Sequence, residues 1–169
     1  AVMSIDSAAL LIEQIIITMM TTEAGESLEL GSLFEKLQLV EPGEESRQVE
    51  NRIWEVWCDH EEPEAVEAME HVVAALNQGS LADANERLNH MVNRWPTWAE
   101  AWNKRATLRF VEERDLESMQ DIERTLQLEP RHFGAISGFG QICMRAGDVA
   151  SAVVAFEKAV RLNPNFEDI

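Results

Sequence analysis

Residues 99–130 decide the fold, and they read AEAWNKRATLRFVEERDLESMQDIERTLQLEP. Two runs with apolar residues at helical spacing stand on either side of the polar segment 112–115. This spacing predicts two helices, over 98–112 and 116–128. Proline cannot continue a helix, so Pro130 marks the end of the second one.

The same pattern recurs on both sides with a period of 34 residues. The recurring sets are Pro96, Pro130 and Pro164; Leu88, Ile122 and Phe156; and Met91, Thr125 and Ala159. Small residues at Ala84, Ser118 and Ala152 allow the two helices of each unit to approach closely, and Gly79 and Gly147 permit the turn between them. The register predicts further helices over 64–78, 81–94, 132–146 and 149–162. Such a repeat is typical of a helix-turn-helix solenoid.

The chain resembles the tetratricopeptide repeat family. Residues 99–102, Ala-Glu-Ala-Trp, are similar to the opening signature of its unit, and Ala106 and Gly140 occupy its small-residue positions. Residues 99–108 and 128–135 also resemble bacterial and organellar members of unassigned role. The resemblance implies an all-α fold: a right-handed α-solenoid of three units, at 65–98, 99–132 and 133–166. Glu113 replaces the glycine of the family's turn, so we expect an irregular turn in the second unit.

Residues 1–63 lie outside this register and carry fourteen acidic against three basic side chains. We expect them to form an N-terminal helical cap, separate from a repeat domain at 64–169. The run 7–20 is apolar on nearly all sides but too short for a membrane span. Such a helix must be covered. Either it packs in the protein's own core against the first repeat, or it binds a partner through Ile12, Ile15, Ile16 and Met19.

Trp54 and Trp57 fall at helical spacing, and we expect them to pack against the first repeat as well. Cys58 and Cys143 are too few for a disulfide framework and are expected to be buried thiols. No Asn-x-Ser/Thr acceptor occurs, and no basic residue precedes Lys36. These features favour an intracellular, soluble protein of the cytoplasm or an organelle interior. The start, Ala-Val-Met, is typical of a processed or trimmed chain.

The composition restricts the partners. The 31 acidic and 14 basic residues give a formal charge of −17, which repels nucleic acid and anionic membranes. We therefore expect a basic or apolar protein or peptide. The histidines lack the spacing of metal ligands, and Gly138-Phe139-Gly140 lacks the third glycine of a phosphate loop, so close helix packing is the expected role of these glycines. The sequence predicts no cofactor, no metal site and no enzyme.

The family resemblance places the first helix of each unit on the inner face of the solenoid. The groove residues it implies are Met69, Val73, Asn77, Asn103, Thr107, Ser137, Gln141, Met144 and Arg145. Their polar members either bind a partner or are simply solvated. The resemblance does not extend to the lysine, asparagine and arginine clamp of chaperone-tail receptors, since Met69, Val73, Gly134 and Gly138 stand at its positions and Lys104 between them fits poorly.

Two functions remain. The leading one is a scaffold or adaptor that holds a partner in the groove, through the apolar helix, or both. The alternative is a permanently assembled subunit of a larger complex or homo-oligomer. No further helix follows residues 149–162, so we expect Val153, Val154 and Val160 to meet a partner, a second copy or further chain.

Overall fold

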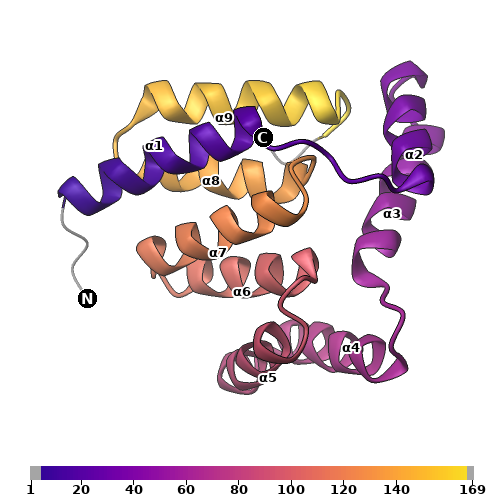
Figure 1. Ribbon diagram of the computed structural model, residues 1–169, viewed down its shortest axis with the longest axis horizontal. Helices are drawn as coiled ribbons and strands as arrows, with labels where there is room; N and C mark the ends of the chain where they lie inside the picture. Colours follow the sequence, from indigo (N-terminus) through magenta and orange to yellow (C-terminus); the bar gives the residue numbers. More distant parts are fainter. Residues whose placement is uncertain (1–4, 167–169) are drawn as a thin grey trace.

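A computed structural model describes residues 5–166 of the chain, with side chains from Ser7 onward, and this part folds into nine α-helices (Figure 1). They are α1 (Ile5–Thr21), α2 (Leu28–Leu39), α3 (Glu44–Cys58), α4 (Pro63–Asn77), α5 (Leu81–Arg94), α6 (Ala99–Val111), α7 (Asp115–Leu128), α8 (Phe133–Arg145) and α9 (Val149–Leu162). The all-α prediction is confirmed. No predicted helix end in the repeat region is wrong by more than one residue.

The last six helices pack as three consecutive pairs, α4 with α5, α6 with α7 and α8 with α9. The small residues of the seam are buried in all three pairs, as predicted for Ala84, Ser118 and Ala152. Gly140 shows how close the helices come. A Cβ atom added there would lie 2.6 Å from the Phe156 ring.

The three turns within the pairs share one backbone geometry. Gly79, Glu113 and Gly147 have φ angles of 72°, 59° and 81°, in the left-handed region. After Glu113, the Arg114 N–H donates to the Arg109 carbonyl at 2.8 Å, as at the two glycine turns. The expectation of an irregular second turn is therefore wrong. The helix pairing imposes the conformation on a glutamate, at a steric cost that glycine would avoid.

The N-terminal helices do not pack where the sequence order suggested. Figure 1 shows α1 running along α9 and α7, and these contacts join Ile15 and Met19 of α1 to Met119 of α7 and Ala155 of α9 in one apolar cluster. The expectation that α1 packs against the first repeat is wrong. The large apolar side chains of the first unit, such as Met69 and Leu88, are already buried in a separate cluster, so they are not available to cover this helix.

Trp54 and Trp57 of α3 also pack elsewhere than expected. Their rings lie 5.6 and 5.2 Å from the ring of Phe133, at the start of α8. The front helices thus share a core with the second and third units, whereas α4, α5 and one side of α6 form a second core around Trp95 and Trp98. The domain boundary between 63 and 64 stays a prediction.

Candidate functional site

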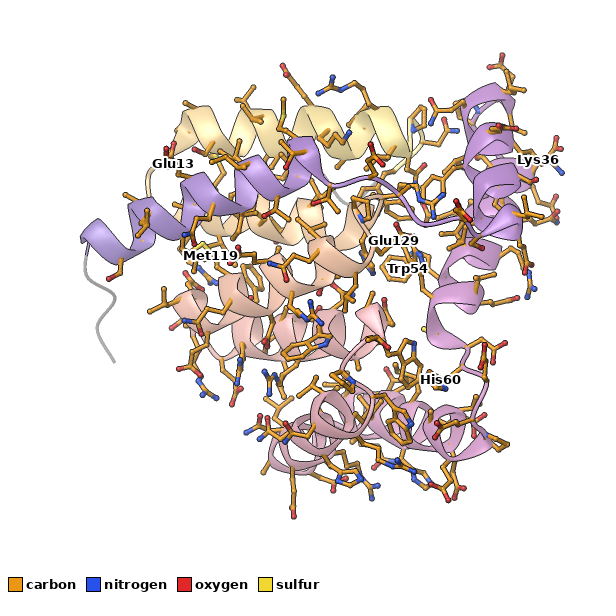
Figure 2. The ribbon with its side chains drawn as sticks, viewed as in Figure 1. Glu13, Lys36, Trp54, His60, Met119 and Glu129 are labelled. Carbon is orange, nitrogen blue, oxygen red and sulfur yellow. The ribbon has the colours of Figure 1, made fainter. Side chains whose placement is uncertain are left out.

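A cavity of about 390 Å³, here called the anchor pocket, lies between α6 and α8. Ile122 of α7 also lines it, and Trp54 of α3 and Phe166 complete the wall. Figure 2 shows Trp54 between α3 and the repeat helices. None of the described side chains that line the pocket is charged. This is unusual for a chain with a formal charge of −17.

The anchor pocket brings together four predicted groove residues. Thr107 and Gln141 are exposed, and Asn103 and Ser137 are buried. Asn103 is engaged, because its amide donates to Glu100 at 3.1 Å. The buried hydroxyl of Ser137 has no hydrogen-bond partner within the described residues. Such an unsatisfied group costs about 1–3 kcal/mol, so it needs an explanation.

Two glycines of α8 line the same pocket for different reasons. A Cβ atom at Gly134 would lie 2.6 Å from the Trp54 ring, so this glycine lets the indole approach the helix. A Cβ atom at Gly138 would meet no described atom within 4 Å. The close packing expected for Gly138 and Gly140 therefore holds only at Gly140. Gly138 faces open space.

A second cavity, of about 590 Å³, lies beside the first unit and is here called the first-unit cavity. It brings together the predicted residues Met69, Val73 and Asn77. Its other lining residues come from α3, the residue that follows it and α4: Arg52, Glu55, Cys58, Asp59, Val66, Glu70 and Ala74. Arg52 is its single cation among the described residues, and this side chain already pairs with Glu29 and Glu55. The first-unit cavity is therefore acidic.

The last two predicted groove residues lie outside both cavities. Met144 is exposed at the end of α8. Arg145 pairs with Asp115 at 2.6 Å and lies 4.2 Å from the centre of the Phe110 ring. Its charge is therefore already neutralised by a contact within the chain.

The predicted residues of the apolar helix lie mostly inside the molecule. Ile12, Ile15 and Met19 are buried, and Ile16 is half-buried. The opposite side of α1 is exposed instead. Leu10, Ile17 and Met20 keep 58%, 54% and 64% of their surface open to solvent. A partner that contacts α1 in this arrangement would meet this outer side.

Glu100 forms the most strongly coupled polar cluster, next to the anchor pocket. Its carboxylate is fully buried and accepts from His132 Nε2 at 2.7 Å, from Lys104 Nζ at 2.8 Å and from Asn103. Burial raises the pKa of Glu100, but His132 and Lys104 outweigh it and bring the pKa to about 2. The carboxylate stays ionised and fully partnered, which suits a structural role.

This cluster also fastens α3 to the repeats. His132 Nδ1 accepts from the Ala135 N–H, which leaves Nε2 to donate to Glu100. Trp57 stacks on the His132 ring at 4.1 Å, and its carbonyl accepts from Trp98. These contacts hold α3 in place, and α3 in turn places Trp54 at the anchor pocket.

Neither cysteine is an activated thiol. Burial raises the pKa of Cys58 to about 11 and that of Cys143 to about 12. The described residues contain no group of three or more histidine, cysteine or acidic side chains placed to hold a metal. Among the same residues, no helix has the length and apolar character that crossing a bilayer requires.

Sequence reasoning missed three contributors to the site: Trp54, Phe166 and the open space at Gly138. Trp54 and Phe166 come from outside the first helices of the units, so the groove register could not include them. The signal at Gly138 was available, since an interior helical glycine costs about 1 kcal/mol relative to alanine. Only the structure separates a packing glycine from one that borders a cavity.

Comparison with known proteins agrees with this architecture. No protein-family model matches the chain. A protein of Rhizobium etli named TPR repeat-containing protein is 29% identical over 152 residues, which cover 90% of this chain and 74% of that protein. The aligned length exceeds the repeat region, so the similarity reaches into the N-terminal helices. Together with the three helix pairs, this relative confirms the chain's resemblance to the tetratricopeptide repeat family.

Proposed function

We propose that this protein is an interaction module that binds a segment of another protein along α4, α6 and α8. The anchor pocket is the observation that carries the proposal, because it is an uncharged recess of about 390 Å³ bordered by neutral hydrogen-bonding side chains. This combination is typical of sites that bind side chains and peptide groups. A catalytic role has no comparable support, since the most perturbed carboxylate, Glu100, is enclosed by its partners.

Affinity capture from the native organism tests the proposal. The full chain is compared with Thr107→Arg, which places a long cation at the edge of the anchor pocket, and with the matched control Gln120→Arg. Both residues are exposed on helices, but only Thr107 lines the pocket. We expect the natural partner to be lost with Thr107→Arg and retained with Gln120→Arg. Equal capture by the two variants would reject groove binding.

A second function, that of a permanently assembled subunit, is favoured by a different observation. Large apolar side chains are exposed on the outer sides of α1 and α9: Leu10, Ile17, Met20, Val149, Val153 and Val160. Exposed apolar patches often mark protein interfaces. Light scattering of the purified chain separates the two functions. A monodisperse monomer supports the adaptor, whereas oligomers or aggregates relieved by Val153→Ser support the subunit.

A further inference from the structure

Two neighbouring residues of α8 lack an explanation in the packing of this chain. Ser137 buries a hydroxyl that no described group satisfies, and Gly138 weakens the helix although no described atom lies near its missing Cβ. Both residues line the anchor pocket. An occupant of the pocket would explain both, since it would satisfy the hydroxyl and use the space that any larger side chain at 138 would fill.

The charges around the pocket indicate the chemistry of this occupant. A charged group entering the pocket would lose water and find no opposite charge, because none of the described lining residues is ionisable. The pocket wall supplies apolar surface from Trp54, Phe110 and Phe166. An aliphatic or aromatic side chain fits these conditions.

The first-unit cavity, which shares the wall helix α3 with the anchor pocket, indicates what flanks that side chain. Its carboxylates include Asp59 and Glu70, and the paired Arg52 leaves them without a free cation in the described lining. The whole chain carries −17. An approaching basic segment is therefore attracted, and an acidic one is repelled.

We infer that the anchor pocket binds an uncharged apolar side chain of a basic partner peptide, whose backbone exchanges a hydrogen bond with the Ser137 hydroxyl. This inference rests on the proposed function and specifies its ligand. Trp54 makes the site dependent on the N-terminal helices, because α3 supplies one wall. The site is thus built jointly by the repeats and the segment that precedes them.

Short peptide libraries test the ligand chemistry directly. The central position is fixed as Leu, Phe, Ala or Glu, the flanks as Lys or Glu, and the remaining positions are randomised. Peptides retained by the immobilised full chain are identified by mass spectrometry, and their affinities are measured by fluorescence anisotropy. We expect retention of Lys-flanked peptides with central Leu or Phe, with at least about tenfold weaker binding for central Ala. Added salt should weaken this binding.

Three variants locate the bound peptide. Ser137→Ala should lower the affinity for the peptide by about 2- to 10-fold, the value of one hydrogen bond. It should not lower the melting temperature of the free protein. Gly138→Leu should abolish binding by filling the pocket, whereas Gly138→Ala should retain most of it and stabilise the helix. Ser151→Ala, on α9 and outside the pocket, is the matched control and should bind like the natural chain.

The possible failures are distinguishable. Preference for central Glu or for Glu flanks overturns the inferred chemistry, and unchanged binding by Gly138→Leu overturns the inferred place. Failure of every library member to bind at about 1 mM also overturns the inference. In each of these cases, loss of the natural partner with Thr107→Arg leaves groove binding intact. Capture that is insensitive to Thr107→Arg rejects the proposed function itself.

Discussion

Glu100 is a fully buried carboxylate that accepts hydrogen bonds from three side chains. Four side chains from α6 and the start of α8 form the cluster: Glu100, Asn103, Lys104 and His132. Asn103 was predicted as a groove contact, but its amide donates a hydrogen bond to Glu100 within this cluster. The sequence could not show this, because Glu100 and His132 are 32 residues apart and meet only when consecutive units stack.

The depressed pKa of Glu100 predicts acid sensitivity. A carboxylate whose pKa falls from 4.5 to about 2 on folding stabilises the protein above about pH 4.5, and this stability is lost as the pH falls towards 2. The full effect is about 3 kcal/mol. Urea unfolding at about pH 6 and pH 3 measures it. Glu100→Gln should be less stable at the higher pH and should lose less stability on acidification.

The exposed Glu86 provides a control for this prediction, since acidification also reduces the general repulsion within an acidic chain. Glu86→Gln should show the same pH dependence as the natural protein. If Glu100→Gln also follows the natural protein between these pH values, the buried carboxylate is not the group that titrates.

At the scale of elements, the turns show how a repeat tolerates a residue that its backbone disfavours. Glu113 adopts the same left-handed conformation as Gly79 and Gly147. The hydrogen bond from the Arg114 N–H to the Arg109 carbonyl closes the turn, and α6 and α7 pack extensively on each other. The sequence predicted the place of the turn correctly and its geometry wrongly, because tertiary packing overrides the local preference.

Replacing Glu113 by glycine should therefore stabilise the protein. Glycine removes the steric cost of the left-handed conformation, and the net gain is about 0.5–1 kcal/mol after the extra entropy of the unfolded chain. Glu112, with φ of −80°, is the matched control, and Glu112→Gly should destabilise. Thermal unfolding of both variants measures the difference. A fall in stability for Glu113→Gly would contradict this prediction. It would show that the glutamate side chain stabilises the fold by more than the left-handed conformation destabilises it.

At the scale of the whole molecule, α1 belongs to the core of the repeat region. Its inner side joins α7 and α9, 90 or more residues further along the chain. The apolar sequence of α1 shows that the helix must be covered, but it does not indicate which of the other helices will cover it. The structure shows that α1 covers the second helices of the second and third units, α7 and α9, and not the first unit.

Two isoleucines of α1 test this arrangement. Ile15 is fully buried, and Ile17 keeps 54% of its surface exposed. Ile15→Ala should lower the free energy of unfolding by about 2–4 kcal/mol, whereas Ile17→Ala should change it by less than about 0.5 kcal/mol. Urea unfolding gives both values. Equal, small effects would indicate that α1 does not remain docked in solution.

The fold was largely readable from the sequence, and the site was only partly so. The 34-residue period located the six repeat helices, because prolines and small residues have fixed mechanical roles in each unit. The family resemblance implied an inner-face position for Thr107, Ser137 and Gln141, and all three line the anchor pocket. The period could not reveal that Trp54 and Phe166 wall the anchor pocket, since long-range packing of non-repeated residues leaves no periodic signal.

The central claim is that partners bind in the groove, and photo-crosslinking tests it most directly. A photoreactive phenylalanine analogue replaces Gln141 at the anchor pocket, Ile17 on the outer side of α1 or Val153 on the outer side of α9, all of them exposed. Each protein is irradiated in native extract. The account predicts a partner adduct from position 141 that excess Lys-flanked peptide suppresses. Adducts from positions 17 and 153 without one from 141 would contradict it.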